Sequence, residues 1–229
     1  ILSGIDCLIE KGKKYVIVGK SGCGKSTLIK LLSGYYSTYK GKILYDDTEF
    51  HMLDKDSVVQ LSSIIHQNIY MFDETIYDNI CLHEHYPEEQ VEKVIADSGL
   101  TEFISELPTG LQYRVGENGS NLSGGQKQRL NLARALLKDV DVYIFDEATS
   151  NIDVESENHI LNVIETLTQT KTVIFITHRL QSVVHCNEIY VMQQGALVEQ
   201  GTHQELMHQE GIYHHMYQNQ QELEVYSHE

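Results

Sequence analysis

The stretch YVIVGKSGCGKST at residues 15–27 contains an apolar run, a glycine-rich segment and a Lys-Ser pair, in that order. This order predicts a strand at Tyr15–Val18, a loop, and a helix from Lys25 that ends at Gly34. Glycines between a strand and a helix allow backbone N–H groups to surround phosphate oxygens. Lys25 would supply a positive charge for the β- and γ-phosphates, and Ser26 a hydroxyl for Mg²⁺. We call residues 19–27 the phosphate loop.

Strand-like and helical patterns alternate over most of the chain. Further strands are expected at Ile43–Tyr45, Ser63–His66, Val140–Phe145, Thr172–Thr177 and Glu188–Met192. Further helices are expected at Pro87–Ser98, Gln126–Lys138 and Val154–Leu167, and after the capping box formed by Thr202 and Glu205. The longest strands are apolar on both faces, which indicates a buried parallel sheet. The predicted fold is therefore α/β: a P-loop NTPase core with a mostly parallel sheet and a small antiparallel β portion.

The segment 68–138 differs from the rest because it contains helical patterns and no convincing strand. We expect it to be a helical subdomain inserted into a catalytic core formed by residues 1–67 and 139–229. Together they would make one domain that spans residues 1–229.

A second set of polar residues follows two buried strands. Asp146 and Glu147 come where VDVYIFDEATS at 140–150 leaves its strand, and His178 closes the strand TVIFIT. Asp146 suits Mg²⁺, which prefers oxygen ligands, and Glu147 could orient or deprotonate an attacking water. Ligands of open α/β sheets bind at the carboxyl ends of the strands, where Lys25, Asp146 and His178 would converge.

The stretch NLSGGQKQR at 121–129 places two glycines at the start of an amphipathic helix. Exposed N–H groups at such a helix N-terminus form a second site for an anion. With LSGGQ at residues 122–126, which we call the signature segment, the chain resembles the ATP-binding cassette (ABC) family of ATPases over nearly its whole length. Gln67 resembles the family's glutamine that touches Mg²⁺ and faces the transport domain. Asp153 resembles its D-loop residue, and His178 the histidine that contacts the γ-phosphate.

The resemblance implies ATP and Mg²⁺ as ligands and assigns the site residues. The catalytic residues would be Glu147, His178 and Gln67, and the metal-binding residues Ser26, Gln67 and Asp146. The nucleotide-binding residues would be Gly19, Ser21, Gly22, Cys23, Gly24, Lys25, Ser26, Thr27, Ser123, Gly124, Gly125, Gln126 and Asp153. In this family the signature of one subunit contacts the ATP on another, so a second copy of the domain is an expected partner in a head-to-tail dimer.

Three segments resemble the exporter branch of the family: FDETIYDNI at 72–80, VGENGSNLSGG at 115–125 with Glu117, and GALVEQGTHQEL at 195–206. The resemblance implies a motor domain of an exporter, whose transmembrane domain would lie upstream in the same polypeptide. The expected location is the cytoplasmic side of a membrane, the plasma membrane of a bacterium. The expected cargo is a peptide or bacteriocin, with a lipid or drug as the alternative.

Composition bears on the alternatives. With 17 basic and 33 acidic residues the formal net charge is −16, which disfavours a nucleic-acid partner. A soluble ABC ATPase in nucleic-acid or translation work, and a regulatory ATP-binding module, remain the other candidate functions. The four scattered cysteines indicate reduced thiols, and Cys23, beside Lys25 and a helix N-terminus, is expected to react with maleimide before Cys7. None of residues 1–14 is aromatic, so the family's adenine-stacking aromatic and first strand would lie upstream.

Overall fold

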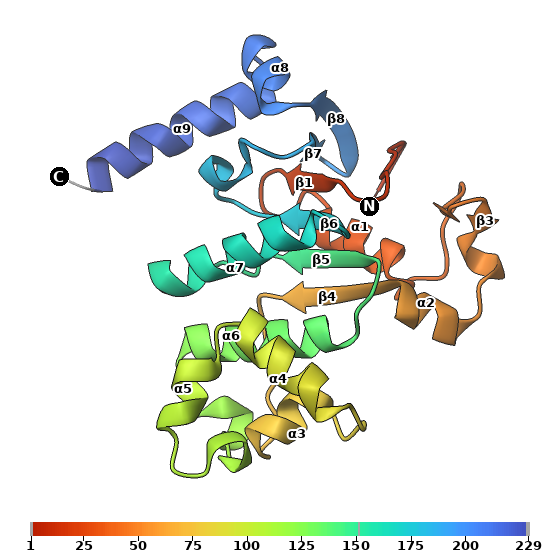
Figure 1. The fold of residues 1–229 in the computed structure, drawn as a ribbon. Coiled ribbons are helices and arrows are strands. Elements are labelled where there is room, and N and C mark those ends of the chain that lie inside the picture. Colours follow the sequence, from red (N-terminus) through yellow and green to blue (C-terminus); the bar gives the residue numbers. More distant parts are fainter. Residues whose placement is uncertain (1, 151, 228–229) are drawn as a thin grey trace.

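The computed structural model describes residues 2–150 and 152–227, and a six-stranded sheet lies at its centre (Figure 1). The strand order is β4-β5-β6-β1-β7-β8. The first five of these strands are parallel, and β8 is antiparallel to β7. The strands are β1 (Lys14–Val18), β4 (Ser62–His66), β5 (Val142–Asp146), β6 (Thr172–Ile176), β7 (Glu188–Gln193) and β8 (Ala196–Gly201). The predicted α/β fold with a mostly parallel sheet is confirmed.

Helices cover both faces of this sheet. The α-helices are α1 (Lys25–Leu32), α2 (Lys55–Leu61), α3 (Ile76–Cys81), α4 (Glu88–Asp97), α5 (Thr101–Glu106), α6 (Gly124–Leu137), α7 (Val154–Leu167), α8 (His203–His208) and α9 (Ile212–Ser227). The short 3₁₀ helices are η1 (Phe50–Met52), η2 (Gly110–Gln112), η3 (Glu117–Gly119) and η4 (Leu180–Val183). In β1, Val16 and Val18 pack in a hydrophobic cluster with residues of α6, α7 and α9, whereas Tyr15 and Ile17 pack with α1. This alternation explains why the strand is apolar at every position.

The helices α3, α4, α5 and α6 form the lower part of the molecule in Figure 1 and share a hydrophobic cluster of their own. Helix α6 belongs to two clusters: Leu130 and Ala133 pack among these helices, while Leu132 and Ala135 pack against the sheet. The segment 68–138 is helical, as expected, and its described residues include only an isolated bridge between Thr75 and Arg114. The exact subdomain boundaries stay a prediction.

The small antiparallel β portion is also confirmed. Residues 43–45, expected as a strand, contribute β2 (Leu44–Tyr45), which pairs with β3 (Thr48–Glu49) in a separate two-stranded sheet. The turn between them begins at Asp46, whose φ of 49° lies in the left-handed region. Such a short hairpin with an exposed Leu44 has no apolar face to add to the central sheet.

Two elements near the end of the chain were missing from the sequence prediction. The strand β8 follows β7 after the two-residue turn Gln194–Gly195, in which both φ angles are positive, as a tight hairpin requires. The helix α9 follows α8, and its first N–H groups, those of Ile212 and Tyr213, donate to the carboxylate of Glu199 on β8 at 2.5 and 2.9 Å.

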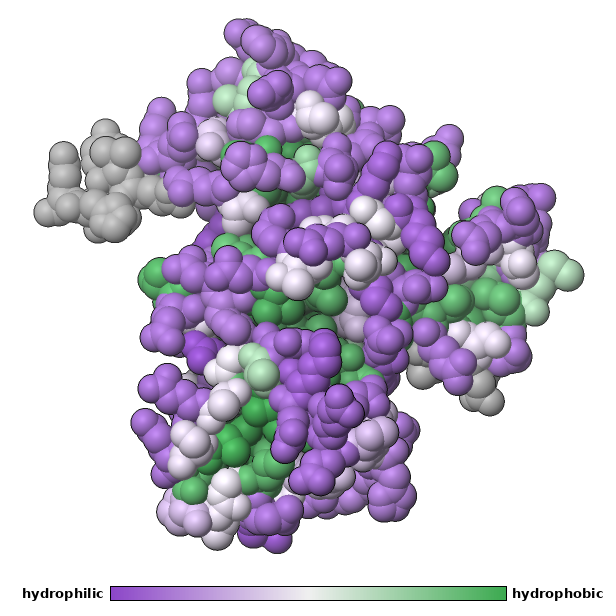
Figure 2. Space-filling model, viewed as in Figure 1, coloured by the Kyte–Doolittle hydropathy of each residue, from purple (hydrophilic) through white to green (hydrophobic). Residues whose placement is uncertain are grey.

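Hydrophilic side chains cover most of the face shown in Figure 2, in keeping with the charge of −16. Hydrophobic residues gather on the right of that view, over the part that carries β3 and α2 in Figure 1. Within residues 2–150 and 152–227, no helix has both the length and the apolar character needed to span a membrane.

Candidate functional site

The phosphate loop connects β1 to α1 at the carboxyl end of the sheet. Gly19 and Gly24 have φ angles of 152° and 114°, which favour glycine. A Cβ atom at Gly19 would lie 2.4 Å from the carbonyl oxygen of Met192, so a larger residue would displace backbone. The N–H of Gly195 donates to the carbonyl of Cys23 at 2.8 Å. The glycines and the β7–β8 hairpin therefore fix the curved shape of the loop.

Lys25 is the buried cation of this loop, with 5% of its surface exposed. Its Nζ donates to the carbonyl oxygens of Gly19 at 2.8 Å and Lys20 at 3.4 Å. Within the described ranges no carboxylate lies within ion-pair distance of it, so its charge is balanced only by carbonyl dipoles. Such a group favours an anionic ligand, because burial of an unpaired charge is costly. The exposed residues of the loop are Lys20, Ser21, Gly22 and Ser26, and Thr27 is half-buried.

The expectation that maleimide reaches Cys23 before Cys7 is wrong as regards solvent exposure, because Cys23 is the more buried of the two thiols. Cys23 is buried, and its Sγ would lie only 2.7 Å from a Cβ atom at Gly19, so the thiol points under the loop. Cys7 is half-buried, and burial, with a smaller contribution from Asp6, raises the pKa of its thiol. The loop that holds Cys23 against the sheet, rather than the local charge, decides which thiol a reagent reaches.

Asp146 is the last residue of β5, next to the end of β4. Its side chain is mostly buried, and its carboxylate lies 3.7 Å from Nδ1 of His66. Gln67 follows β4, and its backbone N–H donates to the carbonyl of Asp146 at 3.0 Å. Pairing of β4 with β5 therefore brings Gln67 beside Asp146.

Glu147 and His178 form a contact at the same sheet edge. Nε2 of His178 lies 2.7 Å from Oε1 of Glu147, with both side chains partly exposed. The φ of Glu147 is 55°, an uncommon value for this residue type, and its N–H donates to the carbonyl of Ile176 at the end of β6. This bond turns the chain so that the Glu147 side chain reaches His178. The pair combines a proton acceptor with a hydrogen-bond donor that can shift to a ligand.

The signature segment forms the first turn of α6. The Ser123 hydroxyl accepts from the N–H of Gln126 at 3.2 Å, and the Gln126 side chain accepts from the N–H of Ser123 at 2.9 Å. This capping box leaves Gly124 and Gly125 in the first turn, where N–H groups have no partner within the helix. The turn therefore presents free N–H groups, as an anion site requires.

Asp153 lies beside this turn and caps α7. Its carboxylate accepts from the N–H and the hydroxyl of Ser156 at 2.8 and 2.9 Å. A Cβ atom at Gly125 would lie 2.2 Å from the Ser156 hydroxyl and 2.6 Å from the Asp153 carboxylate, so only glycine fits there. The N-termini of α6 and α7 thus meet at one place, and Asp153 has a structural partner in its own chain.

The structure separates the predicted residues into two groups. One gathers at the carboxyl edge of the sheet and consists of the phosphate loop, Gln67, Asp146, Glu147 and His178; the other consists of the signature segment and Asp153. Among the described residues, no hydrogen bond or ion pair joins the signature segment to the phosphate loop.

Two glutamines with a place beside the site were not predicted. Gln128 is 1% exposed on α6, and its amide donates to the carbonyl of Ala148 at 2.5 Å, one residue after Glu147. The sequence signal that could have identified Gln128 is its position as a polar residue on the apolar face of α6. Gln220, on α9, bonds to the chain around His178, and the sequence gives no signal for a contact between residues so far apart.

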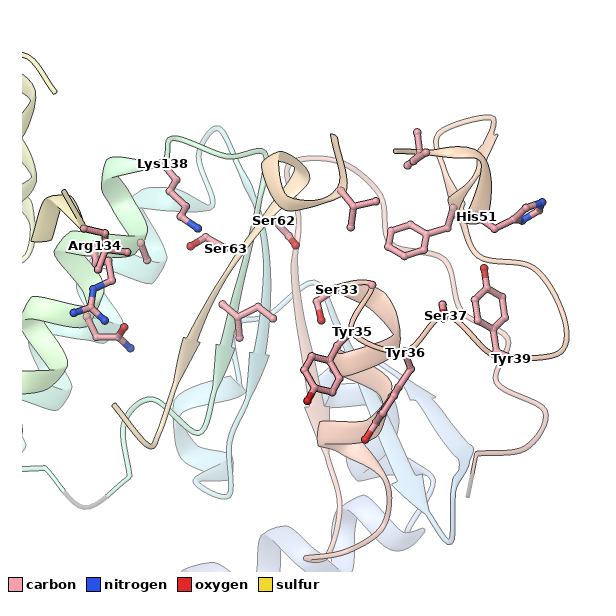
Figure 3. A pocket seen from close by; sticks show the side chains of 18 residues that line it. Ser33, Tyr35, Tyr36, Ser37, Tyr39, His51, Ser62, Ser63, Arg134 and Lys138 are labelled. Carbon is pink, nitrogen blue, oxygen red and sulfur yellow. The ribbon is translucent and has the colours of Figure 1, made fainter. Parts of the chain in front are cut away.

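A cavity of about 740 Å³ lies away from the phosphate loop, between the end of α1, β4 and the end of α6. Figure 3 shows Tyr35 and Tyr36 after α1 on one side, and Arg134 of α6 and Lys138, which follows α6, on the other. The Arg134 guanidinium is held by the carbonyl of Asn79 at 2.8 Å, and burial lowers its pKa. Tyr35 is 74% exposed, so the cavity opens onto an aromatic surface.

Comparisons with known proteins agree with this geometry. A family model described as ABC transporter matches residues 2–150. A protein of Francisella tularensis subsp. holarctica named ATP-dependent lipid A-core flippase is 43% identical over 221 residues, which cover 96% of this chain and 36% of the relative. An uncharacterized ABC transporter ATP-binding protein of Haemophilus influenzae is 43% identical over 97% of this chain and 40% of its own length.

A solved structure of a bacterial Atm1-family ABC exporter with ATP bound is similar with a TM-score of 0.91 and 35% identity, over 96% of this chain and 39% of that one. The chain therefore spans less than half the length of these relatives. The chain belongs to the ABC transporter family as an exporter-type ATP-binding domain.

Proposed function

We propose that this domain hydrolyses ATP at the carboxyl edge of its sheet and drives export across a membrane. The observation that carries the proposal is the Glu147–His178 pair at the same edge as the buried cation Lys25. Lys25 would bind the β- and γ-phosphates. Glu147 would take a proton from a water molecule while the oxygen of that water bonds to the γ-phosphorus. The bond between the γ-phosphorus and the oxygen that bridges it to the β-phosphate would then break, which releases ADP and phosphate.

The pair also supports a role for His178 before the reaction. While His178 bonds to Glu147, one oxygen of the carboxylate is occupied by the histidine. A γ-phosphate nearby would attract the histidine N–H and leave Glu147 to the water. Binding of ATP would thereby prepare its own hydrolysis.

The residues present fit a Mg²⁺ ion that is shared with nucleotide. Among the described residues no group of three or more His, Cys, Asp or Glu side chains could hold a metal alone. Nucleotide-bound Mg²⁺ needs few protein ligands, because phosphates and waters complete its octahedron. The exposed Ser26 hydroxyl and the carboxylate of Asp146, with Gln67 beside it, would hold the ion. Bound Mg²⁺ would neutralise charge on the phosphates.

The separation of the two residue groups supports a head-to-tail dimer. The N–H groups of Gly124 and Gly125 have no partner within the helix, and among the described residues no bond ties the signature segment to the phosphate loop of its own chain. We infer that Ser123, Gly124, Gly125 and Gln126 contact ATP on a second copy, with Asp153 at the same junction. Each ATP would then lie between two helix N-termini.

The cavity beside Tyr35 and Arg134 supports contact with a membrane part. Exposed aromatic surface of this kind marks a protein interface, and the relatives extend well beyond the length that matches this chain. We infer that a transmembrane domain docks there and places the cassette on the cytoplasmic side, with Gln67 and Glu117 relaying its position. As cargo, a lipid now has better support than a peptide or bacteriocin, because several relatives are named lipid A-core flippases.

Replacing Lys25 by Ala tests the nucleotide site. Loss of charge-assisted bonds predicts ATP binding about ten- to a hundredfold weaker, with hydrolysis lost. Lys20→Ala is the matched control, because it removes the same charge from an exposed position of the same loop. Titration calorimetry with Mg²⁺-ATP gives both affinities. Wild-type affinity in Lys25→Ala would refute the assignment of the loop.

A further inference from the structure

The position of His178 depends on a loop that follows β6. Thr177 is buried, and its hydroxyl accepts from the N–H of Arg179 at 2.9 Å. The 3₁₀ helix η4 begins at Leu180. Among the described residues, the bonds within the loop are short and local, and side chains from other elements also hold His178 in place.

Gln220 of helix α9 supplies such a contact. Its Nε2 donates to the carbonyl of His178 at 2.9 Å, and its Oε1 accepts from the N–H of Leu180 at 2.8 Å. One primary amide thus pairs with an acceptor and a donor on the two sides of the loop, much as a neighbouring strand would. A carboxylate could make only the second bond, because it has no hydrogen to donate.

The helix that carries Gln220 is itself fixed at its start. The carboxylate of Glu199 accepts from the first two N–H groups of α9, as described above. Tyr213 is fully buried, and its hydroxyl lies 2.8 Å from Nδ1 of His203. Gln220 follows Tyr213 by seven residues, or about two helical turns, and so lies on the same face. Anchoring at Tyr213 therefore directs Gln220 to the loop.

A second contact holds the opposite side of the loop. The Arg179 guanidinium pairs with Glu157, a largely buried residue of α7. The loop around His178 is consequently held by α7 through Arg179 and by α9 through Gln220. Without the bonds from Gln220, the loop would be held by α7 alone among these two helices.

We propose that Gln220 is a positioning residue for ATP hydrolysis: it holds the backbone of His178 so that the imidazole meets Glu147 and, in turn, the γ-phosphate. The proposal rests on the catalytic role of Glu147 and His178 proposed above. It makes the C-terminal helix α9 part of the hydrolytic machinery, although none of the described side chains of α9 bonds to the phosphate loop. A change at Gln220 acts on turnover and leaves ATP binding by Lys25 unaltered.

The test compares Gln220→Ala and Gln220→Glu with Gln221→Ala, a control at the next, exposed position of the same helix. Loss of the two bonds predicts a kcat about five- to a hundredfold lower. The KM for ATP and the calorimetric Kd should stay within about twofold of wild type. Gln220→Glu keeps the size and the acceptor, so it reports on the bond to His178 even if Gln220→Ala folds poorly.

A double-mutant cycle separates positioning from general stability. If Gln220 acts through His178, Gln220→Ala should lower kcat in the wild-type background and have almost no further effect in a His178→Ala background. Equal losses in both backgrounds, or a wild-type kcat in both Gln220 variants, would overturn the proposal. Wild-type turnover of His178→Ala alone would instead refute the proposed catalytic role on which it rests, so the two failures are distinguishable.

Discussion

Replacing Glu147 by Gln tests the catalytic assignment most directly. Glutamine has the same shape, and its Oε1 can still accept a hydrogen bond from His178, now 2.7 Å from the glutamate oxygen. It cannot take the proton of the attacking water. Loss of a general base slows a reaction about 10²–10⁴-fold, which is roughly 2.7–5.4 kcal/mol of activation free energy. Because the side chain is partly exposed, the free energy of unfolding should change by about 0.5 kcal/mol or less.

Phosphate release measured at saturating Mg²⁺-ATP gives kcat, and calorimetry gives the ATP affinity. Glu102→Gln is the control, because it makes the same chemical change on the exposed surface of α5. Glu147→Gln should bind ATP as wild type does and should accumulate as an ATP-dependent dimer in light scattering. Adding Ser123→Arg should remove that dimer, since a bulky cation would replace the hydroxyl at the signature turn. A Glu147→Gln protein that hydrolyses ATP within threefold of wild type would refute the reasoning.

Three further results are expected. Ser123→Ala and Thr202→Ala each remove a capping box and should each cost about 1 kcal/mol in thermal unfolding, but only Ser123→Ala should also weaken dimerisation with ATP. The pKa of Asp153 is lowered by the backbone N–H, and then the hydroxyl, of the residue three positions on. Its stabilising effect should therefore be present above about pH 4 and lost as pH falls through the lowered value, and Asp153→Asn should remove that part of the acid titration of stability. Maleimide followed by mass spectrometry should label Cys7 before Cys23, with no protection by ATP.

The parts of the fold that sequence patterns predicted well are those set by neighbouring residues. The phosphate loop is one, because a glycine-rich turn between a buried strand and a helix is a local feature. The C-terminal ends of β5 and β6 are a second such feature, because the continuous apolar runs in the sequence stop just before Asp146 and His178. The strand β8 was missed because it lies at a half-exposed edge of the sheet and its residues, ALVEQG, do not alternate between polar and apolar.

What the sequence could not predict depends on contacts between distant residues. Nothing near Gln220 indicates that its amide meets a loop more than forty residues earlier. The burial of Cys23 likewise depends on the β7–β8 hairpin, whose Gly195 bonds to it from far along the chain. Local charge pointed to a reactive thiol, and tertiary packing reversed that expectation.

Helix α6 links the two residue groups of the candidate site within one chain. Its first turn is the signature segment, and Gln128, one turn later, bonds to the carbonyl of Ala148 next to Glu147. That amide is buried, so breaking its bond would leave a carbonyl without a partner at a cost of about 1–3 kcal/mol. Between Gly125 and Gln128 the helix has no glycine or proline at which it could bend. A displacement of the signature turn that carries Gln128 with it would therefore move the Glu147 segment or break a buried hydrogen bond, and would tie the two proposed ATP contacts of a chain to each other mechanically.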